Sequence, residues 1–230
     1  MVCHLKLCLF FTLFFFAQNA QASVDYCQVL NAGGKTEFLE AGNVRWLPLS
    51  APKFLKSGDK IRTADKSYAE ISTSSDFSGL LKLGANSELE VMGEDLSRFF
   101  LRKGVLFVLR EEDSNVPEKQ AREEVLFQIF TEDAIIGLLQ GGCSAGVSEK
   151  GTWVHVYSEH VKIEPLHSGK QKNDFRFLRE GFKYFMARSQ NKEFQNSGRM
   201  HYGDFIEWQL WIKKCYERKD ARAKELLVKK

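Results

Sequence analysis

Short stretches in which apolar and polar residues alternate follow one another along most of the chain. A period of two is typical of half-buried β-strands, because successive side chains of a strand point to opposite faces of a sheet. These stretches are residues 45–47, 60–63, 68–71, 80–83, 88–91, 99–109, 125–131, 134–139, 152–157 and 161–164. Strands at intervals of roughly 8–12 residues predict an all-β body, built as a sandwich, barrel or solenoid.

Several segments between these stretches have the composition of turns. Residues 99–109 read as two strands that meet at a bend at Lys103-Gly104. The charged segment 111–123 predicts a solvated hairpin loop, and 167–174 predicts a surface turn. We also expect the glycine-rich segment that contains Cys143 to be a turn.

The period of the pattern changes near residue 204, after a polar connector at 189–203. Asp204 can cap a helix, with Glu207 three residues later in the position of a capping box. Four residues then recur on one helical stripe: Phe205, Trp208, Ile212 and Cys215. The pattern predicts an amphipathic helix over 204–230, packed on a β domain that spans residues 23–188.

The first 22 residues have the layout of a secretory signal peptide. Lys6 precedes an apolar run that is too short to cross a bilayer, and small residues at Ala20 and Ala22 fit a signal peptidase. We expect cleavage between Ala22 and Ser23, and therefore a periplasmic or secreted protein without a transmembrane span. An uncleaved anchor or a buried core segment is the alternative.

The charge of the chain is concentrated at its carboxyl end. The sequence holds 33 Lys and Arg against 30 Asp and Glu, a net charge of +3 that is too small to predict nucleic-acid binding. Residues 213–230 alone carry eight basic and three acidic side chains. This basic helix is either an ordinary solvated helix or a contact with an anionic surface: phospholipid, wall polymer or an acidic envelope protein.

Three cysteines remain after the expected cleavage, namely Cys27, Cys143 and Cys215. They allow one disulfide in three possible pairings, in a compartment that permits disulfides. We expect a Cys27–Cys215 bridge that ties both ends of the chain to the β body. A bridge that uses Cys143, or three reduced thiols, is the alternative.

The candidate binding face is the row Trp153, His155 and Tyr157, which alternation places on one face of a strand. Such a row can stack on a sugar ring or a flat ligand, or it can be a cross-strand aromatic row without a ligand. A metal site that pairs His155 with His160 is a weaker reading. The sequence contains no nucleophile elbow, zinc-protease pair or phosphate loop, so we expect neither an enzyme nor a cofactor.

The order of several short motifs resembles that of the FecR domain family over about residues 40–165. In that family a Gly-Asp-x-Ile-x-Thr step, a Leu-Gly-x-x-Ser-x-Leu turn, a Leu-x-x-Gly-x-Leu hinge and an Ala-x-Ile-Gly element follow one another. The matching segments here are 58–63, 83–89, 101–106 and 134–137, after Gly42-Asn43-Val44. Gly58 and Gly84 would reverse the chain with positive φ angles, and Asp59 would bond backbone amides in its turn.

The resemblance implies a compact β-solenoid or sandwich-like FecR domain in the cell envelope, which acts as a binding or scaffolding module. Family members are regulatory partners in sigma and anti-sigma signalling at the cell surface, which is the first alternative. A hydrolase of wall polymers is the second. The chain departs from the family at 138–146, where an Arg-Gly-Thr corner is missing.

Overall fold

The computed structural model describes residues 27–74, 78–93, 96–111, 127–166, 175–188 and 195–228. Three predictions lie outside these residues. They are the signal peptide at 1–22 with its cleavage site at Ala22 and Ser23, the charged loop at 111–123 apart from Glu111, and the turn at 167–174.

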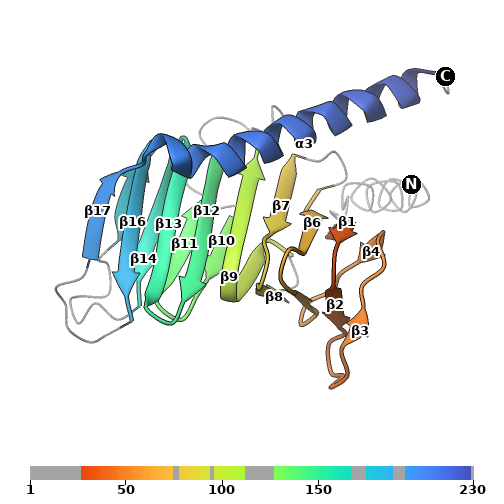
Figure 1. Cartoon of the computed structure of the whole chain (residues 1–230), viewed down its shortest axis with the longest axis horizontal. Helices are drawn as coiled ribbons and strands as arrows, with labels where there is room; N and C mark the ends of the chain where they lie inside the picture. The colour runs from red at the N-terminus through yellow and green to blue at the C-terminus, as the bar shows by residue number, and fades with distance from the viewer. Residues whose placement is uncertain are drawn as a thin grey trace, which may run out of the picture.

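The described residues form a β body with one carboxyl-terminal helix, which confirms the predicted fold class (Figure 1). The strands make two open layers that share strand β9. In hydrogen-bonding order, layer A contains β4 (Lys53–Phe54), β1 (Gln28–Gly33), β6 (Tyr68–Ser72), β7 (Gly79–Leu83), β9 (Arg98–Arg110), β12 (Gly141–Ser148), β13 (Gly151–Ser158), β16 (Phe182–Ala187) and β17 (Gln195–Arg199). Layer B contains β3 (Leu47–Pro48), β2 (Thr36–Leu39), β5 (Lys60–Thr63), β8 (Glu88–Met92), β9, β10 (Phe127–Phe130), β11 (Ala134–Leu138), β14 (His160–Pro165) and β15 (Arg176–Arg179).

Strand β9 joins the two layers by bending at Gly104, as the sequence predicts. Residues before the bend pair with β8 and β10 in layer B, and residues after it pair with β7 and β12 in layer A. The φ angle of Gly104 is 84°, in the left-handed region that glycine adopts without strain. A Cβ atom at this position would lie 2.5 Å from the Cα atom of Ser87, so the bend also needs the space that glycine leaves.

The main core fills the space between the layers, where the alternating strands of both sheets point their apolar side chains inward. Its largest fully buried members include Ile61, Ile71, Leu83, Leu101 and Ile136. A buried carboxylate, Asp59, orders the turn beside this core. It accepts hydrogen bonds from the backbone amides of Ala41 and Lys56, both at 2.9 Å, as the sequence predicts.

One turn and two segments differ from the sequence predictions. Gly58 has the expected positive φ of 86°, but in the turn between β7 and β8 the left-handed residue is Asn86, with φ of 54°, and not Gly84. The segment around Cys143 is not a turn but the strand β12. Both faces of β12 are buried, so its residues show no alternation of polar and apolar types. The predicted connector contains strand β17, which pairs with β16, so the β body extends to Arg199.

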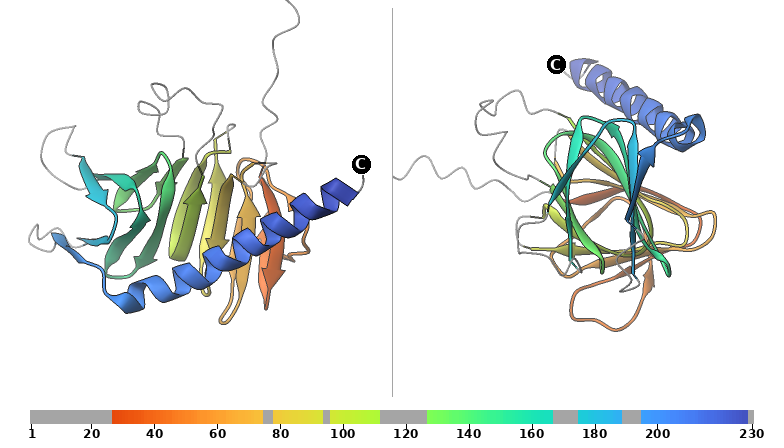
Figure 2. Two further views of the ribbon diagram at one scale, coloured as in Figure 1. Left: turned by 90° about the horizontal axis from the view of Figure 1, so that it is seen from above. Right: turned by 90° about the vertical axis from the view of Figure 1, so that its left-hand side faces the viewer.

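Helix α3 (Tyr202–Val228) lies on the outer face of layer A and runs diagonally across its strands (Figure 2). Seen end-on, the strands surround the core and the helix lies outside them. Beyond the strands the helix projects from the body, so that its end is among the outermost parts of the described chain (Figure 1). No helix among the described residues is both long and apolar enough to cross a membrane.

Candidate functional site

The structure brings Trp153, His155 and Tyr157 together on the outer face of β13, as alternation predicts. The ring centroids of Trp153 and His155 are 4.5 Å apart, and those of His155 and Tyr157 are 6.4 Å apart. Trp153 and His155 are half-buried, whereas Tyr157 is only 6% exposed. The three rings therefore form one continuous row whose Tyr157 end is covered.

Helix α3 supplies the cover over Tyr157. The Trp208 ring stacks on the Tyr157 ring at 4.4 Å between centroids and 6° between planes, and Phe205 meets the Tyr157 ring edge-on at 5.8 Å. The Tyr157 hydroxyl and the Ser144 hydroxyl share a buried hydrogen bond of 2.8 Å. Burial raises the pKa of Tyr157 to about 12, so this phenol stays protonated under the helix.

Two glycines of β12 make room for Trp153 of this row and for Trp208 of the helix that covers it. A Cβ atom at Gly142 would lie 2.1 Å from the Trp208 ring, and one at Gly146 would lie 2.0 Å from the Trp153 ring. The glycines of β12 therefore serve close aromatic packing on a strand. Sequence reasoning missed this role, although two glycines four residues apart inside an apolar segment are a signal of close approach.

A second apolar cluster lies between α3 and layer A, separate from the main core. Its buried members are Leu80, Phe107, Leu109, Tyr157, Trp208, Trp211 and Cys215. Apolar burial of this kind is the largest favourable contribution to holding a helix on a sheet. The prediction that the stripe of Trp208 and Cys215 faces protein is confirmed.

The start of α3 is fixed by Asp204, but not as the predicted cap. The helix begins at Tyr202, and the Asp204 carboxylate accepts a hydrogen bond from the backbone amide of His201 at 2.8 Å. Asp204 thus occupies the third helical position and reaches back to the capping residue, as the acidic residue of a capping box does. It also accepts a bond of 3.0 Å from the Lys183 ammonium group on β16.

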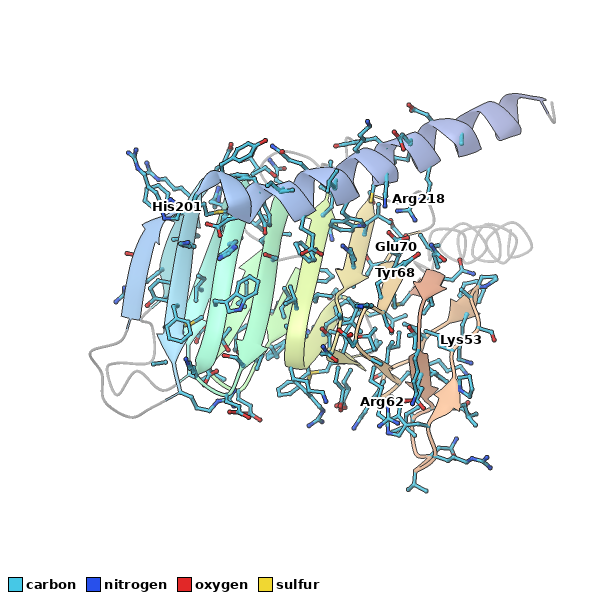
Figure 3. The ribbon with its side chains drawn as sticks, viewed as in Figure 1. Lys53, Arg62, Tyr68, Glu70, His201 and Arg218 are labelled. Carbon is cyan, nitrogen blue, oxygen red and sulfur yellow. The ribbon has the colours of Figure 1, made fainter. Side chains whose placement is uncertain are left out.

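Further ion pairs fasten the helix along its length. Lys82 of β7 lies 2.9 Å from Glu207, and Arg218 binds Glu70 of β6 through both of its terminal nitrogens, one at 3.0 Å (Figure 3). Glu70 is only 7% exposed, so removing Arg218 would leave its carboxyl group buried without this cationic partner. Lys219 pairs with Glu111 at the end of β9.

His155 lies close to the start of the helix, among charged groups. Burial lowers the pKa of His155, Lys183 lowers it further, and the negative charge of Asp204 acts in the opposite direction without reversing the shift. Burial raises the pKa of Asp204, but the bonds from His201 and Lys183 and the neighbouring charges outweigh it and the net shift is downward. With the helix docked, His155 is therefore favoured in its neutral form and Asp204 in its ionised form.

The structure does not bring His155 and His160 together. His155 pairs in register with Lys183 in layer A, whereas His160 pairs with Arg179 in layer B and packs against Phe177. The described residues contain no group of three or more His, Cys, Asp or Glu side chains that could hold a metal ion.

The expected Cys27–Cys215 bridge is wrong for this structure, in which both residues and Cys143 are free, buried thiols. Cys27 and Cys143 lie in the main core between the layers, whereas Cys215 lies in the separate cluster under α3. Burial raises the pKa of Cys27 and of Cys143 to about 12 each, and that of Cys215 to about 11. The three thiols are therefore protonated and shielded rather than reactive.

Helix α3 also has a solvent-facing side, opposite the stripe that packs on layer A. Tyr202, Ile206 and Leu210 are exposed on it, and Lys213 and Lys214 follow within the next turn, both exposed. Sequence reasoning identified the basic residues but missed this outer apolar stripe, because the inner stripe accounts for the helical period on its own.

Comparison with known proteins adds a distant structural likeness. No family model and no curated protein matches the sequence. Two crystal structures of a candidate anti-sigma factor from Parabacteroides distasonis, at 1.65 Å and 2.50 Å resolution, are similar to this chain, each with a TM-score of 0.47 and 12% sequence identity. The likeness covers 65% of this chain and 64% or 63% of that protein, which is less than two thirds of its length. The resemblance to the FecR family stays a prediction from the sequence.

Proposed function

We propose that this chain is a non-enzymatic, exported binding module of the cell envelope, periplasmic or secreted. The two-layered β body is the rigid scaffold, and α3 is the element that docks it on an anionic surface or an acidic envelope protein. Nearby positive charge attracts such partners over distances of about a Debye length.

The observation that supports this proposal is that one side of α3 packs on layer A while the other side carries exposed lysines. The inner side is fixed on layer A by Trp208, Trp211 and Cys215, which are buried. The outer side keeps Lys213 and Lys214 exposed. A helix that is held by one face and carries exposed positive charge on the other can bind a partner without leaving its scaffold.

The helix uses part of its positive charge internally, which guides the choice of variants. Arg218 and Lys219 are engaged by Glu70 and Glu111 on the β body. Deleting residues 213–230 would remove these ion pairs together with Cys215. A loss of partner binding could then not be distinguished from a loss of helix packing on the β body. A deletion of 220–230 and the double variant Lys213→Gln, Lys214→Gln both keep these ion pairs.

The test is binding of the purified protein to two anionic probes at low salt: vesicles of phosphatidylglycerol and phosphatidylcholine, and soluble polyglutamate. We expect binding to both, weakened by added salt, by the deletion of 220–230 and by the double lysine variant. Lys150→Gln, which removes an exposed lysine from the turn between β12 and β13, is the matched control and should bind normally. Absence of binding to both probes would overturn the proposal.

The alternative of a regulatory partner in cell-surface signalling stays a prediction from the sequence resemblance. A neighbouring gene for a sigma factor and one for a TonB-dependent receptor would favour it over a general docking module. The hydrolase alternative predicts turnover of wall polymers that is abolished by His155→Gln, and an assay for released sugars tests it.

A further inference from the structure

The outer side of α3 carries an apolar stripe that the β body does not cover. Tyr202, Ile206 and Leu210 follow one another at four-residue intervals and are 78%, 44% and 59% exposed. Residues four apart lie on the same face of a helix, so these three side chains form one line along it. The helix is therefore apolar on two sides, with Trp208 and Trp211 on the inner one.

The position of α3 makes this stripe reachable by a flat partner. The helix is straight and lies outside the strands, as the view from above and the end-on view show (Figure 2). Because the three side chains are exposed, a partner can reach them while the inner side of the helix stays on layer A. Lys213 and Lys214, exposed one turn further along, add positive charge at the end of the stripe.

We propose that α3 lies in the headgroup region of an anionic phospholipid bilayer, with Tyr202, Ile206 and Leu210 inserted into it. The inference rests on the proposed function and names its anionic surface. A helix with an apolar stripe and adjoining lysines binds a bilayer through buried apolar area and through attraction to anionic lipids. A soluble acidic polymer complements only the lysines, so the exposed stripe favours the bilayer.

A second copy of the chain is a poorer occupant of the stripe. Stable interfaces bury roughly 800 Å² on each partner, which takes about 20–30 residues a side. The stripe offers three side chains, and in a parallel symmetric pair of helices the lysines that follow it would face like charges. The bilayer removes apolar side chains from water and complements the charge at the same time.

The experiment compares two double variants of the full chain on two probes. The first, Ile206→Gln with Leu210→Gln, removes most of the stripe and leaves Lys213 and Lys214 in place. The second, Lys213→Gln with Lys214→Gln, does the reverse. Leu47→Gln is the matched control, because Leu47 is exposed to a similar degree on the distant strand β3. The probes are phosphatidylglycerol-containing vesicles and polyglutamate, with thermal unfolding as the check on folding.

We expect the stripe variant to lose roughly tenfold or more of its partitioning onto vesicles, since two half-exposed apolar side chains no longer insert. It should bind polyglutamate as the unchanged protein does, and its thermal unfolding should be unaltered. The lysine variant should lose affinity for both probes.

Other outcomes separate the inference from the proposed function. Vesicle binding that is unchanged in the stripe variant, with polyglutamate binding intact, overturns the lipid inference and leaves the proposed function standing. A dimer in solution that the stripe variant converts to a monomer also overturns it, in favour of a second copy. If the unchanged protein binds neither probe, the proposed function itself is overturned.

Discussion

The Trp208 ring on α3 packs directly against Gly142 on β12, in a space that any Cβ atom at Gly142 would occupy. The same ring stacks on Tyr157, so the helix is seated through one tryptophan that touches two neighbouring strands. A glycine backbone and an aromatic ring together determine how close α3 comes to layer A.

Replacing Gly142 by alanine should therefore lift or tilt the helix. A Cβ atom 2.1 Å from the Trp208 ring forces a displacement, and overpacking of this kind costs about 1–3 kcal/mol of the free energy of unfolding. Urea unfolding measures the loss. Gly198→Ala on β17 is the control, because a Cβ atom there meets nothing within 4 Å.

The clash also predicts a compensating change. In the double variant Gly142→Ala, Trp208→Leu, the smaller side chain leaves room for the new methyl group, so the two single losses should not add. Strictly additive losses in the double-mutant cycle would show that the contact between the two residues does not seat the helix.

The pair of Arg218 and Glu70 predicts a second effect on stability. Arg218→Met leaves the Glu70 carboxylate largely buried, with Asn31 at 3.4 Å as its remaining hydrogen-bond donor among the described residues. Because Arg218 itself is partly exposed, we expect a loss of about 1–3 kcal/mol, less than for a fully buried pair. Equilibrium unfolding in urea measures it.

A neighbouring ion pair provides the comparison. Lys219 pairs with Glu111, and both side chains are about a third exposed, so Lys219→Met should cost less than about 1 kcal/mol. Adding Glu70→Gln to Arg218→Met removes the buried charge and should restore part of the loss. Equal effects of the two methionine variants would contradict the distinction between a buried and an exposed carboxylate.

A strand of this fold can be predicted from the sequence when only one of its two faces is buried. Strands β5 and β8 have one covered face, so alternation along the sequence predicts them to within a residue of their observed ends. Strand β12 lies between the core and α3, and its glycines and small residues resemble a turn because both faces are buried.

In the candidate site, too, the local pattern along one strand is predictable, whereas contacts between distant segments are not. Alternation along β13 predicts that Trp153, His155 and Tyr157 share a face, and the structure places them so. That α3 covers Tyr157 depends on contacts between residues distant in the sequence, which no local period reports. The Cys27–Cys215 pairing failed for a related reason, since the two thiols belong to clusters on opposite sides of layer A.

The bend in β9 predicts that two glycines with similar φ angles respond differently to alanine. Gly104 and Gly181 have φ angles of 84° and 78°, so alanine is strained at both. Only at Gly104 does the new Cβ atom also meet Ser87; at Gly181 it meets nothing within 4 Å. Thermal unfolding should therefore show a loss of roughly 1–2 kcal/mol for Gly181→Ala and a clearly larger one for Gly104→Ala. Equal losses would mean that the bend relaxes around the methyl group.

The histidine beneath the start of α3 predicts how stability depends on pH. The pKa of His155 is lowered in the folded state from its ordinary 6.5, so on acidification the unfolded chain takes up the proton first. Its contribution to stability is present above pH 6.5 and is lost as the pH falls through 6.5 toward the lowered folded-state pKa. The pKa of Asp204 is also lowered, but from 3.8, so its loss belongs to more acidic solutions.

We therefore expect the free energy of unfolding to fall between pH 7.5 and about pH 5.5, with a slope that cannot exceed about 1.4 kcal/mol per pH unit for one proton. His155→Gln should flatten this part of the profile, because the variant has no proton to bind there. His160→Gln is the matched control, since His160 is exposed on layer B, away from α3. A profile that keeps its slope in His155→Gln would show that the histidine under the helix does not couple proton binding to stability, whereas a slope lost in that variant alone ties the acid sensitivity to the docked start of α3.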